Sequence, residues 1–446
     1  MKLGMILFAV ATFTASNGAA SEIVFENVTV IDGSGAAPAP SMFVRIKDNK
    51  IVEIADHSLT TSPDARTIDG SGKYLIPGLI DTHVHLRGAA EPTEKSRDKK
   101  PDWKSGETAL ASFLYSGVTS IYDAGNDPDY IFRLREDGRA GRLSSPRIFA
   151  TGGIVTYPGS HGASQSATLV DDWPSAKPLI TAHAARHPDM VKFTLEERGW
   201  GARPLIPLLP VELLERLIEF YNDMGIRTTV HTSSELRARE AIFAGVDTLA
   251  HPVIQGPITD DFARLMSAKK IPMSSTLTIG ENYSRLAEHP EFLDEPLYRA
   301  SLSSSEIEKL KTDTRKEYQE RSWTWWMKIM TPIAQENIRK IYEAGGVIAL
   351  GTDQTIGPAV HREMELLAAA GIGPTDVIKI ATHNSAVFLG KEEELGLIAP
   401  GMLADLVLLD ADPSIDINNV KRISAVFKNG AFIERDRLEL AGTPPK

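Results

Sequence analysis

Tyr74-Leu-Ile-Pro-Gly-Leu-Ile-Asp-Thr-His-Val-His85 is the stretch of sequence that predicts both a strand and a site. Its apolar run is typical of a buried β-strand, and the run ends in two histidines one residue apart. Residues i and i+2 of a strand point to the same side, so the imidazoles of His83 and His85 face one point in space. Because imidazole is a common metal ligand, the pair indicates a metal site.

Three further segments repeat this pattern of an apolar run that ends in a candidate ligand. Val230-His231-Thr232 and Ala250-His251-Pro252 close two short runs, and Val347-Ile-Ala-Leu-Gly-Thr-Asp353 closes another in a carboxylate. On their own, His83 and His85 could equally well be two ordinary polar residues at the end of a strand. Four histidines and one aspartate at strand ends are hard to explain as core residues, which favours the metal site.

Strand-like runs alternate with helical runs through the middle of the chain, as in a parallel sheet wound by helices. Eight candidate strands lie at 79–85, 119–124, 147–152, 190–194, 227–232, 248–251, 271–277 and 347–353. Eight such units predict an α/β fold, a (β/α)8 TIM-like barrel. Active sites of such barrels lie at the carboxyl ends of the strands, where the candidate ligands fall.

Both ends of the chain carry short alternating segments that predict small β-strands. They lie at 23–31, 43–46, 50–54, 404–409 and 425–433. We predict a discontinuous β-sandwich domain from residues 21–78 and 395–446, flanking a barrel domain of residues 79–394.

Residues 278–346 form a helical excursion within the barrel domain and contain the cluster Trp323-Thr-Trp-Trp-Met327. Trp323, Trp326, Met327 and Met330 share an i, i+3, i+4, i+7 face, which predicts an amphipathic helix that packs inward. The alternative interpretation is that the tryptophan cluster contacts a ligand directly. Both interpretations hold together if the excursion covers the active-site end of the barrel as a lid.

Composition limits the partners of this chain of 446 residues. A formal net charge of -11 and the lack of a Lys/Arg-rich run argue against nucleic acid and favour a small-molecule or dipeptide-like substrate. The chain has no cysteine, so metal ligands must be histidine, carboxylate or a modified lysine. The sequence leaves open whether the protein forms a homo-oligomer.

Residues 1–20 match the parts of a secretory signal peptide, with a lysine, an apolar stretch and small residues before Ser21. The alternative is an uncleaved anchor. The apolar stretch is too short for a comfortable bilayer span, and no later stretch replaces it. We therefore predict an exported protein, periplasmic or secreted, with no stable membrane insertion after cleavage.

These motifs resemble the amidohydrolase superfamily, in particular its branch of imidazolonepropionase-like and prolidase-like metal-dependent hydrolases. The resemblance rests on residues 77–85, 351–353 and 396–409 and on His231 and His251. It implies that one metal takes His83, His85 and Asp353 and that a second takes His231 and His251. Lys192, on the fourth candidate strand, would bridge them once carboxylated, because the product is a bidentate anion suited to divalent metals. An ordinary lysine at a strand end is the alternative.

The resemblance also implies a chemistry. Two divalent ions would activate a bridging hydroxide. Zinc is the first choice for these ligands, and Mn, Co or Fe are alternatives. Asp353 would act as general base and then as general acid. We expect a hydrolase of a peptide-like or N-acyl amino acid amide. A cyclic amide, carbamate or lactone hydrolase is the alternative, and a non-catalytic binding protein that retains the fold is the alternative of another class.

Two local features bear on the substrate. Deaminases of the superfamily place a catalytic Glu three residues after the strand-five histidine, whereas here Ser234 holds that position. Glu235 comes one residue later and would face differently on an extended segment. This ranks deamination below amide hydrolysis. The Gly-rich loop after strand three carries Tyr157 and His161, which are candidate substrate ligands. Ala163 stands where prolidase-like members tend to carry Asp after His-Gly, which weakens a transfer of dipeptide specificity.

Overall fold

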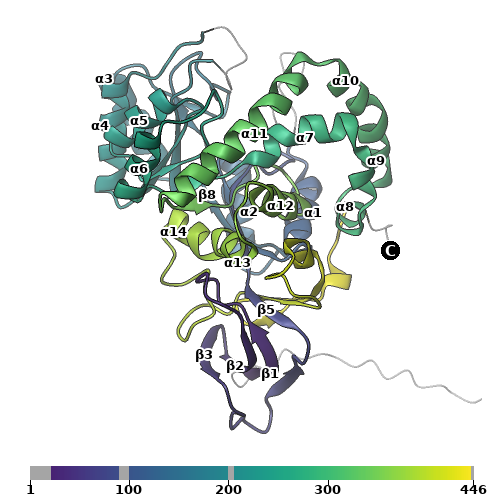
Figure 1. Ribbon diagram of the computed structural model, residues 1–446. Helices are drawn as coiled ribbons and strands as arrows, with labels where there is room; N and C mark the ends of the chain where they lie inside the picture. Colours follow the sequence, from purple (N-terminus) through teal and green to yellow (C-terminus); the bar gives the residue numbers. More distant parts are fainter. Residues whose placement is uncertain (1–21, 90–99, 199–204, 443–446) are drawn as a thin grey trace, which may run out of the picture.

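The computed structural model describes residues 22–89, 100–198 and 205–442, and its centre is a barrel of parallel strands (Figure 1). The strands are β6 (Leu79–Val84), β7 (Val118–Asp123), β8 (Arg147–Ala150), β11 (Met190–Thr194), β12 (Arg227–His231), β13 (Thr248–Leu249), β14 (Met273–Ser274) and β15 (Ile348–Ala349). Each overlaps one of the eight strands predicted from the sequence. The prediction of an α/β barrel is confirmed.

Backbone pairing follows chain order around this barrel. β6 to β8 pair in parallel, and so do β11 to β15; β9 (Val155–Thr156) joins the second group beside β11, with β10 (Thr168–Leu169) at its edge. Backbone hydrogen bonds join the groups on both sides: Asp189 N donates to Ala150 O at 2.9 Å, and Thr82 N donates to Leu350 O at 2.8 Å. The barrel is closed, so the carboxyl ends of its strands share one rim.

Helices cover the outside of the barrel. They are α1 (Trp103–Tyr115), α2 (Pro128–Arg139), α3 (Trp173–Ala184), α4 (Val211–Asp223), α5 (Glu235–Phe243), α6 (Asp260–Lys269), α12 (Pro358–Ala369), α13 (Pro374–Lys379) and α14 (Ser385–Leu389). Several begin at an aspartate whose carboxylate accepts a first-turn N–H, which satisfies a donor that the helix itself cannot. Asp127 accepts from Tyr130 N at 2.9 Å and Asp172 from Ser175 N at 2.8 Å.

Seven helical segments fill the connection between β14 and β15. They are α7 (Leu277–Glu288), η1 (Pro290–Asp294), α8 (Pro296–Ser301), α9 (Ser304–Lys309), η2 (Leu310–Thr314), α10 (Arg315–Glu320) and α11 (Ser322–Glu343). In Figure 1, α8, α9 and α10 follow one another up the right-hand side of the molecule, and α11 runs back beside α7. Met327 and Met330 of α11 are buried, while Trp325 is 65% exposed. The amphipathic helix predicted from the tryptophan cluster is confirmed.

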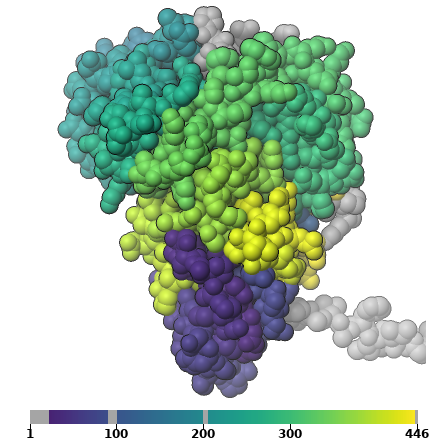
Figure 2. All heavy atoms as spheres, in the orientation of Figure 1, coloured from purple at the N-terminus to yellow at the C-terminus, as the bar shows by residue number. Residues whose placement is uncertain are grey.

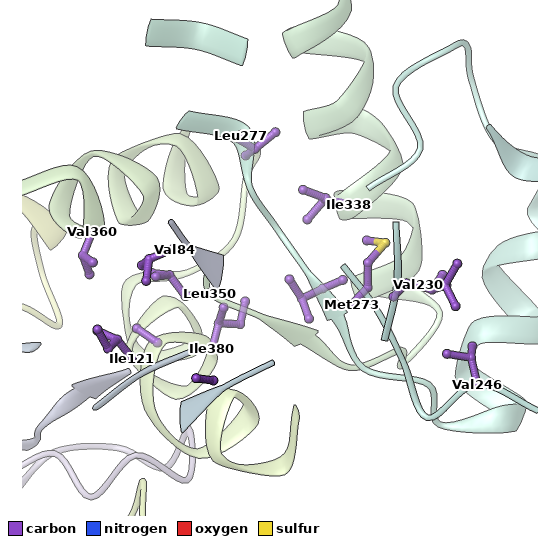
Figure 3. Packing of buried hydrophobic residues seen from close by; sticks show 14 of the residues in the cluster. Val84, Ile121, Val230, Val246, Met273, Leu277, Ile338, Leu350, Val360 and Ile380 are labelled. Carbon is purple, nitrogen blue, oxygen red and sulfur yellow. The ribbon is translucent and has the colours of Figure 1, made fainter. Parts of the chain in front are cut away.

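The main hydrophobic core lies between the barrel and its helices. Val84 of β6, Ile121 of β7, Met273 of β14, Ile338 of α11 and Val360 of α12 belong to one buried cluster (Figure 3). Strands that are covered on both faces read as near-continuous apolar runs, which is why the sequence pattern located them.

Both chain ends build a second sheet, as predicted. Its strands are β1 (Glu22–Val30), β2 (Ala39–Lys47), β3 (Lys50–Ala55), β4 (Arg66–Asp69), β5 (Tyr74–Pro77), β16 (Leu406–Leu409), β17 (Ile423–Lys428) and β18 (Ala431–Phe432). The ends meet where β5 pairs with β16, and Figure 2 shows them side by side at one end of the molecule.

This second sheet differs in detail from the predicted β-sandwich. Its eight strands are hydrogen-bonded as one sheet, in the order β18-β17-β16-β5-β1-β2-β3 with β4 also on β1. The sheet curls, so that Phe25 of β1 packs on Phe427 of β17 with ring centroids 5.2 Å apart. One curled sheet thus encloses an apolar core as the two layers of a sandwich would.

Gly78 joins the second sheet to the barrel, since it separates β5 from β6. A Cβ at this position would lie 2.2 Å from Thr119 Oγ1 of β7, so no larger residue fits without a shift. The first barrel strand is therefore a direct continuation of the second sheet.

Two of the sequence predictions concern membranes. The predicted signal peptide, residues 1–20, lies outside the described residues. Within residues 22–89, 100–198 and 205–442, no helix combines the length and apolar character that a bilayer crossing requires.

Candidate metal centre

The six side chains predicted as metal ligands meet at the carboxyl rim of the barrel. The ligand atoms of His83, His251 and Asp353 all lie within 4.8 Å of one another. His85 Nε2 is 3.4 Å from Asp353 Oδ1. The rings of His231 and His251 are 4.4 Å apart, centroid to centroid. Residues from β6, β12 and the ends of β13 and β15 thus form one cluster.

Lys192 of β11 joins the same cluster. Its Nζ lies 2.9 Å from His83 Nε2, and its side chain is 3% exposed. The alternation of the strand sends Lys192 to the barrel interior, on the same side as Thr194. Sequence reasoning placed this lysine on the fourth strand, and the structure brings it to the centre of the candidate ligands.

Buried hydrogen bonds fix Asp353 beside His83. The backbone N of Asp353 donates to His83 O at 2.7 Å. Asp81 Oδ1 accepts from His83 N at 3.1 Å and from Thr352 N at 3.0 Å, which ties β6 to the turn after β15. Asp353 has a φ of 52°, in the left-handed region that non-glycine residues seldom adopt. Local backbone strain of this kind clusters at functional sites.

The histidine rings are oriented by acceptors at their Nδ1 atoms. His83 Nδ1 lies 3.0 Å from Ala250 O, and His85 Nδ1 lies 2.6 Å from Gly125 O. A carbonyl oxygen only accepts, so Nδ1 carries the proton and Nε2 keeps its lone pair. His251 Nδ1 lies 2.9 Å from Thr276 Oγ1. Such partners of the second ring nitrogen are typical of metal-binding histidines.

Burial sets the charge state of the cluster. Loss of hydration lowers the pKa of His83, His231 and His251 well below the usual value, so the rings are neutral, as metal ligands must be. Burial also lowers the pKa of Lys192 to about 8, against the opposing charge of Asp353. Burial raises the pKa of Asp353 to about 6, although Lys192 counteracts the rise.

This set of donors fits divalent cations. Neutral imidazole nitrogens and a carboxylate suit zinc and its neighbours in the first transition series. His83, His251 and Asp353 alone satisfy the ligand count of a three-coordinate protein site with room for a water. His85, Lys192 and His231 adjoin these three, so the six side chains together offer enough donors for two cations.

The two predicted substrate ligands lie in different surroundings. The ring of His161 stacks on His231, with centroids 4.2 Å apart and an angle of 26° between the planes. Its carbonyl accepts from Thr194 Oγ1 at 2.8 Å, which holds the loop over β11. Tyr157 is half-buried against the apolar core of the barrel. The structure therefore brings His161, but not Tyr157, into contact with a candidate ligand.

Glu235 points away from the cluster. It is the first residue of α5, and its Oε2 accepts from Thr259 N at 2.7 Å. Its Oε1 accepts from Arg239 Nε at 2.9 Å and from Thr259 Oγ1 at 2.8 Å. Glu235 thus holds the start of α6, which agrees with the interpretation that it faces differently from a deaminase carboxylate.

Glu196 is a buried carboxylate at the site that no motif had indicated. It is 1% exposed, and its Oε2 lies 3.9 Å from His231 Nε2. Oε1 accepts from Arg198 N at 2.7 Å, and Oε2 accepts from the hydroxyl of Ser233. Burial raises the pKa of Glu196. The i, i+2, i+4 spacing of Lys192, Thr194 and Glu196 is the signal that could have found it.

A cavity of about 860 Å³ opens beside the cluster. His85 lines it, together with residues from the loops after β6, β7 and β8: Arg87, Asn126, Ile154, Gly162 and Ser164. A volume of this size accommodates a small molecule. The Gly-rich loop that carries His161 thus forms one wall of the space next to the candidate ligands.

Residues 74–433 match the amidohydrolase family. An imidazolonepropionase from Fusobacterium nucleatum is 21% identical, over 97% of this chain and 99% of its own length. A prolidase complexed with N-methylphosphonate-L-proline has a TM-score of 0.74 and 22% identity, with 93% of this chain and 99% of that chain covered. A Xaa-Pro dipeptidase with methionine bound in its active site has a TM-score of 0.73 and 23% identity. The match covers 93% of this chain and 100% of the dipeptidase chain. At these identities, the structural likeness supports the fold.

Proposed function

This chain belongs to the amidohydrolase family and hydrolyses a carbon–nitrogen bond, and from that membership we propose that its substrate is a peptide-like or N-acyl amino acid amide. The observation that carries the proposal is the single cluster at the barrel rim, with His83, His251 and Asp353 in reach of one ion. A binding protein that merely retained the fold would have no need for this complete set of buried ligands.

We further propose that the centre is binuclear. His83, His85 and Asp353 would hold one ion, and His231 and His251 would hold the other, with zinc the first choice. Lys192 would lie between them as a carbamate, formed when its neutral amine bonds to carbon dioxide and releases a proton. Two such cations, when bound, acidify a water and polarise the carbonyl that is attacked.

Asp353 would move the proton in this reaction. As the C–O bond forms, its carboxylate accepts a proton from the attacking water; as the C–N bond breaks, it returns a proton to the leaving nitrogen. The backbone bond of Asp353 to His83 supports the assignment, because it holds the carboxylate against the ligands. His161 and Tyr157 would contact the substrate from the loop after β8, with His161 the nearer to the centre.

Hydrolysis of a cyclic amide is the second candidate. It is favoured by the similarity to an imidazolonepropionase over nearly the full length of both chains. A screen of N-acyl amino acids, dipeptides and cyclic amides with the metal-loaded protein separates the candidates. Turnover confined to cyclic amides would overturn the first proposal.

We expect purified protein to hold close to two divalent metal ions per chain, since the candidate ligands suffice for two. Elemental analysis after loading with metal and bicarbonate measures the ratio. A ratio that stays at one contradicts the binuclear centre and removes the bridging role of Lys192.

Glu196→Gln should weaken binding of the second ion about tenfold or more. Its carboxylate lies 3.9 Å from His231 Nε2, the nitrogen that would bind the ion, and a tenfold loss corresponds to about 1.4 kcal/mol of attraction between the carboxylate and the cation. Competition with a chelator measures the affinity without reference to turnover. Glu197→Gln is the matched control, because Glu197 pairs with Arg237 instead. Equal affinities in the two variants would exclude a role for the Glu196 charge.

A further inference from the structure

A second cavity, of about 290 Å³, lies between the helical excursion and the rim of the barrel. Its apolar walls come from the excursion and from the segment after β15, and they consist of Leu286, Phe292, Leu293, Tyr298, Leu302 and Ile356. All six are at least nine-tenths buried. The cavity is therefore an open pocket whose apolar walls belong to a small hydrophobic core, while polar side chains such as Asn282, Thr314 and Gln354 complete its lining.

The volume is too large for a packing defect. Protein interiors hold few voids larger than a water molecule, whose share of liquid volume is about 30 Å³. Ligand pockets begin near 300 Å³, with mostly apolar walls and a few polar groups at defined places. The cavity has the properties of a binding pocket.

The position of the cavity relates it to the metal centre. The segments that follow β6, β14 and β15 supply part of its lining, through Arg87, Thr278 and Gln354. These strands end next to His85, Thr276 and Asp353. Arg87 lines the larger cavity beside His85 as well. Arg87, two residues after His85, is therefore a wall that both cavities share.

The charges at this shared wall favour an uncharged occupant. Arg87 Nη1 donates to Glu306 Oε1 at 2.7 Å, so the guanidinium is already paired with a carboxylate of α9. Lys309 lines the outer part of the cavity but is exposed to water. A charged group placed among the buried leucines and Phe292 would lose its hydration without a counter-ion.

We propose that this cavity binds an aromatic or branched aliphatic side group of the substrate, while the scissile bond lies at the metal centre. The proposal rests on the amide hydrolysis proposed above and adds the substrate class, an amide with a large apolar group next to the bond. The larger cavity, lined by polar loops after β7 and β8, would hold the remainder of the molecule.

Binding of small alcohols tests the pocket apart from catalysis, because an alcohol has no amide bond to cleave. Ligand-observed NMR on the full-length, metal-loaded protein would give dissociation constants for 2-phenylethanol, 3-methylbutan-1-ol and ethanol. We expect the two larger alcohols to bind at least tenfold more tightly than ethanol. Equal binding, or no binding of the larger alcohols, overturns the proposal.

Thr314→Phe should abolish this preference, because Thr314 lines the cavity and a phenyl group there would fill it. Thr312→Phe is the matched control: it makes the same change two residues earlier, at an exposed position outside the lining. Asn282→Phe fills the cavity from α7 and replaces Thr314→Phe in the experiment if Thr314→Phe lowers the melting temperature. If a folded variant with the cavity filled still binds the two larger alcohols more tightly than ethanol, the proposal is contradicted.

Kinetic measurements then distinguish failure of the pocket proposal from failure of the amide hydrolysis proposal. N-acetyl-L-phenylalanine should have a kcat/KM at least tenfold above that of N-acetylglycine, and the ratio should approach one in Thr314→Phe. If neither compound is hydrolysed, the amide proposal fails, and the alcohol measurements still decide the pocket. If both are hydrolysed equally by the wild type, the pocket proposal fails and the amide proposal stands.

Discussion

Asp353→Asn should lower kcat by about 10²- to 10⁴-fold, the range typical of a lost general base. An amide cannot accept the proton of the attacking water or return one to the leaving nitrogen. Asparagine keeps the size of the side chain and tolerates the left-handed backbone, so the fold at this position should persist. The defect should fall on kcat more than on KM.

Two measurements make this result specific. The metal content of Asp353→Asn must be determined beside its kinetics, because Asp353 is also a candidate ligand. A near-normal kcat in a metal-replete variant would refute the role in proton transfer. Glu235→Gln is the control, since Glu235 binds Thr259 and Arg239 outside the cluster. A severe loss in that variant would instead favour deaminase-like chemistry.

Lys192→Ala should remove most of the activity and most of the second metal ion. The change deletes the group that would join the two ions and leaves a space among His83, His231 and His251. A short carboxylic acid such as acetate or propionate should restore part of the metal content and part of the activity, because it supplies a bidentate anion of similar size. Metal analysis and turnover at rising acid concentration measure the rescue.

Lys428→Ala offers a comparison with a second lysine whose pKa burial lowers to about 8. Lys428 lies on β17 in the sheet of the chain ends, where its ammonium donates to Ser145 O at 2.8 Å. Its removal should affect stability while the metal content stays unchanged. Normal metal content and turnover in Lys192→Ala would mean that Lys192 has only a structural role.

The barrel and the strand-end positions of its candidate ligands were predictable because both depend on local pattern. Strands buried on both faces form apolar runs, and the alternation of side chains decides which residues face inward at the rim. His83 and Lys192 therefore lie on the strands that the sequence predicts for them, whereas Asp353 lies four residues beyond the end of β15, with a φ of 52°. Their mutual distances follow from barrel closure, which no single segment reveals.

Other features depend on contacts between segments far apart in the sequence. The curled sheet of the chain ends requires β5 to pair with β16, and no local pattern encodes such a partner. Glu196 lies two residues beyond the end of β11, so only an extension of the strand alternation past Thr194 would have indicated it. Residues after His231 were treated as extended, whereas Ser234 caps a helix that begins at Glu235. The direction of Glu235 follows from that helix and from Thr259 on the next one.

The pairing of Leu75 with Leu408 has a consequence for how the protein forms. These residues flank nearly the entire barrel, so their pairing closes a loop that contains it. Contacts of such high sequence separation slow folding, because chain entropy is lost before the contact is gained. During synthesis, β5 emerges long before its partner β16, and it runs through Gly78 into the strand that carries His83. The sheet that leads directly into the first barrel strand is therefore completed only after the last tenth of the chain has emerged.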